Sequence, residues 1–411
     1  MNVIDYAQTQ AHEALEFAVR TGTAVRRSPR VSDFDLPLMV VIAILLTIGM
    51  IMVASASMPI AAQNMSTPWH YLLRQAAYLV AGIGVFALLV RVPVASWEDA
   101  GPYLLLLTVV LLVLVLVPGI GKQVNGAVRW IGAGPIRIQV SELGKLFVIV
   151  YMAGYLVRHP QEVRAGFGGF ARPMVLVMLI SVLLLMEPDF GSASIIVGVT
   201  LAMLFLGGVQ LRVFLPLFVG VAAMMAMLIR FEPYRWARLT NFLDPWKDAY
   251  NGGYQLTQSL IAIGRGDLAG VGLGNSMQKL LFLPEAHTDF VFAIYAEEFG
   301  FIGSLALMGV YGYLVWRGHR IGAESERVGR MFGAYCAYGV SFWLGVQAFV
   351  NFGVNMGVLP TKGLTLPLIS YGGSSLLVTC AALALLLRVD YERRVLQAGA
   401  QHGASGRDAA T

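Results

Sequence analysis

Charged residues are scarce in this 411-residue chain: they make up 13% of it, about half the share found in an ordinary soluble domain. Cysteine is scarcer still, because Cys336 and Cys380 are the only two and neither belongs to a Cys-x-x-Cys pair. A disulfide framework or a cysteine zinc site is therefore not indicated. The sequence also has no His-x-x-x-His pair and no Gly-x-Ser-x-Gly elbow. Zinc hydrolysis and serine acyl transfer thus have little support.

The chain instead has long apolar runs. Hydrophobic residues make up 57% of the sequence, and its mean hydropathy is +0.69. A helix of about 20 apolar residues is long enough to cross a bilayer. We therefore expect an all-α, polytopic membrane protein with about ten spans. The predicted spans are residues 37–57, 71–90, 102–119, 140–157, 173–187, 191–208, 212–230, 289–316, 331–353 and 371–388.

The distribution of basic residues predicts how the chain is oriented. Its net charge is +5, but Lys and Arg are spread along the sequence, which gives no indication of a nucleic-acid partner. With ten spans both termini lie on one side, and that side holds 17 Lys and Arg against 10 opposite. The positive-inside rule therefore predicts cytoplasmic termini. We expect a polar cytoplasmic leader over 1–36, without a signal-peptide core, a membrane domain over 37–390 and a cytoplasmic tail over 391–411.

Three segments on the outer side are unlike ordinary connectors. Residues 120–139, 231–288 and 354–370 mix Trp, Arg, Gly and Pro with apolar residues, and the segment between the seventh and eighth spans is especially long. Loops longer than about 15 residues are often functional or disordered. Because these segments are not polar low-complexity sequence, we expect them to be ordered.

Two acidic motifs lie close to predicted spans. Glu142 and Lys145 are three residues apart, so on a helix they share a face and can neutralise each other. They form either a structural ion pair or part of a functional cavity. In Glu187-Pro-Asp-Phe-Gly191, proline and glycine predict a turn, where Asp189 either caps the next helix or contacts a cation or substrate.

A third acidic motif, Leu283-Pro-Glu-Ala-His-Thr-Asp-Phe290, ends the long outer segment. Asp289 would face the outer mouth of the bundle, where a carboxylate partly removed from water gains proton affinity and can act as a general base. The alternative is a helix cap made by Thr288 or Asp289, with Glu285 solvated. Spacing alone leaves both interpretations open.

Cations and hydroxyls complete the outer motifs. Arg129, in Gly126-Ala-Val-Arg-Trp-Ile131, could bind a phosphate through two N–H groups at once. Lys362 is the only cation of the last outer segment, and Ser370-Tyr-Gly-Gly-Ser-Ser375 follows it with hydroxyls and glycines. Loop geometry is the alternative explanation for these glycines.

The order and spacing of these motifs, together with Leu359-Pro-Thr-Lys-Gly-Leu-Thr-Leu-Pro-Leu-Ile-Ser-Tyr-Gly-Gly-Ser-Ser375, resemble the SEDS family of bacterial cell-wall proteins over about residues 37–390. The Thr361-Lys-Gly-Leu-Thr-Leu366 segment and the polar leader look more like the family's division members than its elongation members. The sequence departs from the family pattern at Val140, where proline is expected, and at Glu187, where glutamine is usual.

The resemblance implies a peptidoglycan glycosyltransferase that polymerises lipid II on the outer face of the bacterial inner membrane, at the division septum. It implies a class B penicillin-binding protein and other divisome membrane proteins as partners. It places the family's essential aspartate on Asp289, as the catalytic base. A divalent cation, Mg²⁺ or Mn²⁺, is a further expectation, with Asp189 as its ligand. The expected substrate-binding residues are Arg129, Glu142, Lys145, His287, Thr288, Lys362, Ser370 and Ser374.

Two other functions compete with polymerisation. A lipid II flippase would depend most on Glu142 and Lys145 and would move lipid without joining sugars. A scaffold that regulates a penicillin-binding protein would tolerate changes at these residues and at Asp289.

Overall fold

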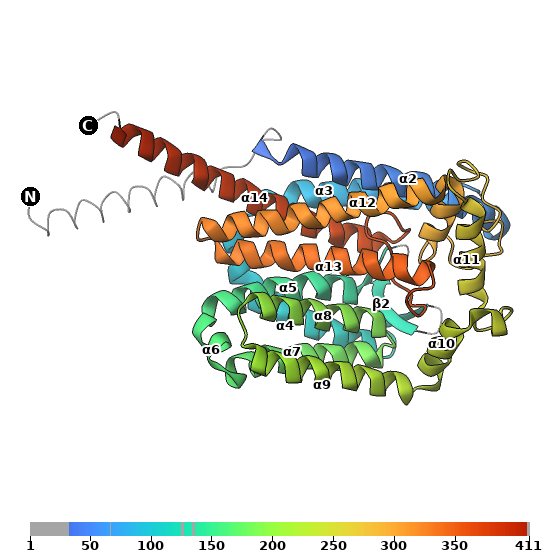
Figure 1. Ribbon diagram of the computed structural model, residues 1–411, viewed down its shortest axis with the longest axis horizontal. Helices are drawn as coiled ribbons and strands as arrows, with labels where there is room; N and C mark the ends of the chain where they lie inside the picture. The colour runs from blue at the N-terminus through green and yellow to red at the C-terminus, as the bar shows by residue number, and fades with distance from the viewer. Residues whose placement is uncertain (1–32, 66, 125–126, 134–135, 409–411) are drawn as a thin grey trace, which may run out of the picture.

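The computed structural model describes residues 33–65, 67–124, 127–133 and 136–408. Most of the predicted leader, residues 1–32, and the last three residues of the tail lie outside the described residues. Long helices run side by side along the molecule (Figure 1). α10, α11 and strand β2 lie at one end of the bundle, and α14 projects beyond the other.

Each of the ten predicted spans coincides with a helix. These helices are α2 (Leu36–Asn64), α3 (His70–Leu89), α4 (Val94–Leu116), α5 (Val140–Arg158), α7 (Phe167–Met186), α8 (Phe190–Leu206), α9 (Leu211–Arg230), α12 (Val291–Arg327), α13 (Met331–Asn355) and α14 (Gly373–Asp408). Eight helices in the described part of the chain are long and apolar enough to cross a membrane. The two helices not among these eight are α8 and α13. α8 is apolar but has only 17 residues. The apolar sequence of α13 is interrupted by tyrosine, glycine, asparagine and glutamine residues. The chain is a multi-pass membrane protein.

The helices differ in how far the protein covers them. The apolar windows of α5 and α14 are 78% and 89% buried, so these two helices form the centre of the bundle. None of α9 is buried, although it is as apolar as the others. An apolar helix with so much of its surface left exposed by the protein needs lipid, which fits the position of α9 at the edge of the bundle (Figure 1).

The first outer segment is folded as a small sheet, which the all-α prediction missed. Strands β1 (Gly121–Val124), β2 (Ala127–Ala133) and β3 (Ile136–Gln139) form an antiparallel sheet in the order β1-β2-β3. The sequence is short and rich in glycine, so its alternating pattern is weak. β3 ends at Gln139 and α5 begins at Val140, so the sheet leads directly into the helix that carries Glu142.

The other outer segments are ordered too, as expected. Residues 231–288 contain α10 (Pro233–Leu243), a 3₁₀ turn η2 (Pro245–Asp248) and α11 (Tyr254–Gly266), and then continue as turns to the start of α12. Residues 356–372 connect α13 to α14 through turns and irregular backbone. α6 (Pro160–Ala165) lies in a connection at the opposite end of the bundle.

Helix α12 is longer than predicted and is broken near its start. It continues past the predicted end of the span at residue 316, where Arg320 and Glu324 form an ion pair one turn apart. Its backbone is non-helical at Gly300, where φ is 69°. Here the amides of Val271 and Gly272 donate to the carbonyls of Glu297 and Glu298. The outer segment thus supplies hydrogen bonds at the break in the helix.

Candidate functional site

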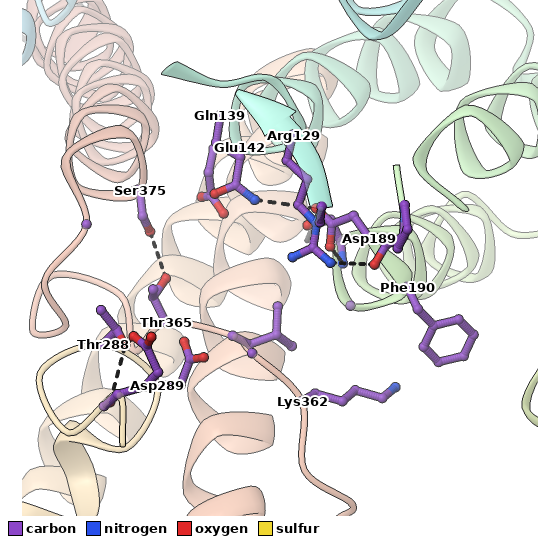
Figure 2. A pocket seen from close by; sticks show the side chains of 18 of the residues that line it. Arg129, Gln139, Glu142, Asp189, Phe190, Thr288, Asp289, Lys362, Thr365 and Ser375 are labelled. Atoms are coloured by element: carbon purple, nitrogen blue, oxygen red, sulfur yellow. Dashed lines mark hydrogen bonds between the residues drawn. The ribbon is translucent and has the colours of Figure 1, made fainter. Parts of the chain in front are cut away.

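A cavity of about 870 Å³ opens at the end of the bundle that carries the sheet and the outer helices. Its walls come from α3, β2, β3, the start of α5, the α7–α8 turn, α10, the segment before α12 and the segment before α14. The predicted site residues that line it are Arg129, Glu142, Asp189, His287, Thr288, Asp289, Lys362 and Ser374. Motifs far apart in the sequence therefore meet in one cavity (Figure 2).

Asp289 lies in the turn just before α12 and is half-buried. Its backbone carbonyl accepts hydrogen bonds from the side-chain amides of Asn351, at 2.9 Å, and Asn355, at 3.1 Å. Burial and, to a smaller extent, the charge of Glu285 raise the pKa of the Asp289 carboxyl to about 7, against the opposing effect of Arg238 and Arg129. A carboxylate with this pKa can accept a proton near neutral pH.

The residues just before Asp289 hold the turn. Thr288 Oγ1 donates to the carboxylate of Glu285 over 2.6 Å. The ring of His287 packs against Tyr71 and Tyr371, and burial lowers the pKa of His287, so its ring is neutral near pH 7. The residue that caps α12 is Phe290, with no side-chain hydrogen bond. The alternative of a helix cap made by Thr288 or Asp289 was therefore wrong.

Cationic side chains line the same cavity as this carboxylate. Arg129 reaches from β2 to the α7–α8 turn, where it donates from Nε to the Glu187 carbonyl over 3.2 Å and from Nη2 to the Pro188 carbonyl. The ammonium of Lys362 lies 4.3 Å from the centre of the Phe190 ring. Figure 2 shows Asp289 and Thr288 across the cavity from Arg129 and Asp189.

Sequence reasoning missed several residues that line the cavity. Arg238, on α10, donates from Nη1 to the Thr361 carbonyl over 3.2 Å, beside Lys362. Arg74, Arg137 and Gln139 also face the cavity. Nothing in their local sequence distinguishes these residues from topology-determining charges. Only the three-dimensional arrangement of the helices identifies these residues as part of the cavity.

Asp189 is a helix cap in this structure. Its carboxylate accepts a hydrogen bond from the Ser192 amide at the start of α8, and Gln139 Nε2 lies 3.4 Å from its second oxygen. Next to it, burial and the charge of Asp189 raise the pKa of Glu187 to about 8, against the effect of Arg129. Glu187 therefore holds its proton more tightly than an ordinary glutamate.

The described residues do not provide a cluster of ligands for the predicted metal site. Within the described residues, no group of three or more His, Cys, Asp or Glu side chains is placed to hold a metal ion. Metal binding by Asp189 therefore stays a prediction.

Two predicted substrate-binding residues do not line the cavity. Lys145 is buried between α5 and α13, where its ammonium donates to Glu142 over 2.7 Å and to Gln347 over 2.8 Å, above the ring of Trp343. The predicted pairing with Glu142 is thus present, and Lys145 itself does not line the cavity. Ser370 is buried, and its Oγ accepts a hydrogen bond from the Leu366 amide, which closes a turn. Direct substrate binding by Lys145 and Ser370 is not supported by this geometry.

Glu142 and Ser374 do face the cavity. Glu142 Oε1 is paired with Lys145, whereas Oε2 has no hydrogen-bond partner among the described residues. Ser374, at the start of α14, accepts from the Gln139 amide over 3.0 Å and donates to the Arg137 carbonyl. The start of the last helix is thus tied to the sheet.

Comparison with known proteins shows the family to which the chain belongs. The model of the cell cycle protein family that comprises FtsW, RodA and SpoVE matches residues 36–395. The probable peptidoglycan glycosyltransferase FtsW of Thioalkalivibrio sulfidiphilus is 54% identical over 87% of this chain and 90% of its own. The protein of the same description from Legionella pneumophila is 53% identical over 85% and 89%.

Solved structures show the same fold. A chain in the structure reported as "Structural coordination of polymerization and crosslinking by a peptidoglycan synthase complex" has a TM-score of 0.72 and 30% identity, over 88% of this chain and 98% of that one. The rod shape determining protein RodA of Thermus thermophilus has a TM-score of 0.67 and 29% identity, over 89% and 99%. The chain therefore belongs to the FtsW, RodA and SpoVE family of cell cycle proteins.

Proposed function

We propose that this protein is an inverting peptidoglycan glycosyltransferase that polymerises lipid II during septal cell-wall synthesis. The observation that carries the proposal is the carboxylate of Asp289, whose pKa is raised to about 7 in a cavity also lined by Arg129, Arg238 and Lys362. A base beside several cations suits a reaction that removes a proton and releases a pyrophosphate. Relatives about half identical in sequence are named for this activity.

In the proposed reaction, Asp289 takes the proton from the 4-hydroxyl of the acceptor sugar. The hydroxyl oxygen forms a bond to the anomeric carbon of the donor as the bond from that carbon to the pyrophosphate breaks. Undecaprenyl pyrophosphate leaves with the bonding electrons, and the α-linked donor becomes a β-1,4 linkage.

The cations that line the cavity would stabilise the leaving pyrophosphate. Arg129 and Arg238 can each offer two N–H groups to phosphate oxygens, and Lys362 adds a point charge. A divalent cation, Mg²⁺ or Mn²⁺, with Asp189 as ligand is a separate prediction; because the described residues offer no ready ligand cluster, no step of the reaction is assigned to it. The undecaprenyl tails would lie along apolar helix surfaces, where each buried CH₂ contributes about 0.8 kcal/mol.

The orientation and the partners are part of the same proposal. The excess of Lys and Arg on the side of the termini supports cytoplasmic termini and a cavity on the outer face of the inner membrane. A chain of the same fold belongs to a peptidoglycan synthase complex that couples polymerisation to crosslinking. This supports a class B penicillin-binding protein as partner, together with other divisome membrane proteins at the septum.

The test is lipid II polymerisation by the full chain in complex with its class B partner. We would compare wild type, Asp289→Ala and the control Asp244→Ala, which removes an exposed carboxylate of the same outer segment. Glycan from wild type and the control but not from Asp289→Ala supports the proposal. Equal activity of all three contradicts the role of Asp289. If none is active while vesicles show lipid II movement that depends on Glu142 and Lys145, the protein is a flippase.

A further inference from the structure

Helix α13 carries three amide side chains on one face. Gln347, Asn351 and Asn355 are spaced four residues apart, so they lie one above another along the helix. All three are at most 2% exposed. Buried amides are costly unless their donors and acceptors are paired, so their partners show what they do.

Each of these amides donates to backbone outside its own helix. Gln347 Nε2 donates to the Thr365 carbonyl over 2.9 Å. Asn351 Nδ2 donates to the carbonyls of Asp289, at 2.9 Å, and Leu364, at 2.7 Å. Asn355 Nδ2 donates to the Asp289 carbonyl over 3.1 Å. The acceptors lie in the two irregular segments that carry Asp289 and Lys362.

The orientation of two of these amides is fixed by what their oxygens accept. Gln347 Oε1 accepts from the Lys145 ammonium and from the Trp343 indole, both over 2.8 Å. Asn355 Oδ1 accepts from the Ala293 amide in the first turn of α12. Because these partners are donors only, neither amide can be flipped, and each NH₂ group must face a carbonyl.

We propose that Gln347, Asn351 and Asn355, here called the amide ladder, are positioning residues that hold the Asp289 and Lys362 segments side by side for glycosyl transfer. The inference rests on the proposed function. Asn351 is the central member, because its NH₂ group joins a carbonyl from each segment. Neither segment has a helix or strand of its own at these points, so the amide ladder replaces regular backbone hydrogen bonding.

The test uses the full chain with its class B partner and the variant Asn351→Leu, which keeps a side chain of similar size but removes both donors. Ser341→Ala is the matched control, since Ser341 is buried on the same helix and its Oγ bonds only within α13. Asn351→Asp, the same shape with at most one donor, serves if the leucine variant does not fold. Hydrogen exchange is followed in residues 285–290 and 360–366, and kcat and KM for lipid II are measured in parallel.

We expect Asn351→Leu to lose exchange protection in both segments and to lower kcat on the order of 10- to 100-fold with KM within about twofold. Asn355→Leu should expose only the Asp289 segment, and Gln347→Leu only the Lys362 segment. The acidic limb of the pH profile of kcat/KM should move to lower pH in Asn351→Leu, because water reaches Asp289. Ser341→Ala should change none of these quantities.

Unchanged protection in both segments, or an unchanged kcat, in Asn351→Leu or its aspartate substitute would overturn the inference. So would equal effects of Ser341→Ala. If wild type makes no glycan, the proposed function fails instead, and the exchange pattern still decides whether the amide ladder holds the two segments.

Discussion

The carboxylate of Asp289 lies against the backbone of Gly363: a Cβ atom added to Gly363 would come within 2.9 Å of Asp289 Oδ2. The two residues are 74 positions apart in the sequence and belong to different outer segments. Only a residue without a side chain allows this approach. Because residue 363 is glycine, the backbone that follows Lys362 can lie directly against the carboxylate of Asp289, the proposed base.

Gly363→Ala should displace the Asp289 carboxylate and lower kcat on the order of 100-fold, since a shift of about 1 Å in a reacting group can have that effect. The matched control is Gly372→Ala, which lines the same cavity but whose added Cβ would meet its neighbours at 3.6 Å or more. The measurement is the rate of lipid II polymerisation by each of the two variants. Equal rates would show that the contact at Gly363 does not constrain the carboxylate.

The pH dependence of kcat/KM should report the ionisation of Asp289. Activity needs the carboxylate form, so the rate should fall as the pH drops through about 7. Glu285→Gln removes a negative charge that raises this pKa but keeps an acceptor for Thr288. The acidic limb should therefore move to lower pH in this variant. A limb that stays in place, or moves upward, would contradict the assignment of the base.

Asp289→Asn should abolish polymerisation yet stabilise the fold. The pKa of Asp289 is raised from 3.8 to about 7 in the folded protein, so between these values the folded state holds a proton that the unfolded state has lost. The wild type therefore loses stability as the pH rises through this window, and the asparagine variant does not. The gain in Tm should grow from about pH 4 to pH 7 and then level off. A gain that is independent of pH would argue against the raised pKa.

The buried pair of Glu142 and Lys145 should behave as one unit. Glu142→Gln or Lys145→Met alone leaves a buried charge without its partner, which typically costs about 3–5 kcal/mol of stability. The double variant should be less destabilised than the two single losses added together. Thermal unfolding of the four proteins measures this coupling. Additive losses would mean that the 2.7 Å contact contributes nothing beyond two separate side chains.

The helices could be predicted from the sequence because the bilayer allows so few alternatives. Every apolar run had to become a helix that satisfies its own backbone, and all ten predicted runs did. The ends were less predictable, since α12 continues into charged sequence where ion pairs rather than hydropathy sustain it. The small sheet was missed because its strands are only four to seven residues long.

The site residues could be predicted where a short sequence motif contained charged or hydroxyl side chains suited to catalysis or phosphate binding. Eight of the predicted site residues line the cavity, including Asp289, which the resemblance of its motif to the family had identified. Arg238 and Arg74 could not be identified, because their local sequence is that of any interfacial arginine. Lys145 was assigned to the substrate because an intramembrane charge suggests a cavity, yet the buried carboxylate and amide beside it already pair with it.

The break in α12 has a consequence for how the chain is assembled. At Gly300 the helix meets the segment 267–272, and besides the bonds to Glu297 and Glu298, the amides of Phe301 and Ile302 donate to the carbonyls of Asp267 and Leu268. Backbone N–H and C=O groups inside the bilayer cannot form hydrogen bonds with water. The outer segment precedes α12 in the chain, so during synthesis these partners emerge before the helix that needs them. The break in α12 is therefore fully hydrogen-bonded only once the segment ahead of it in the chain has folded against it.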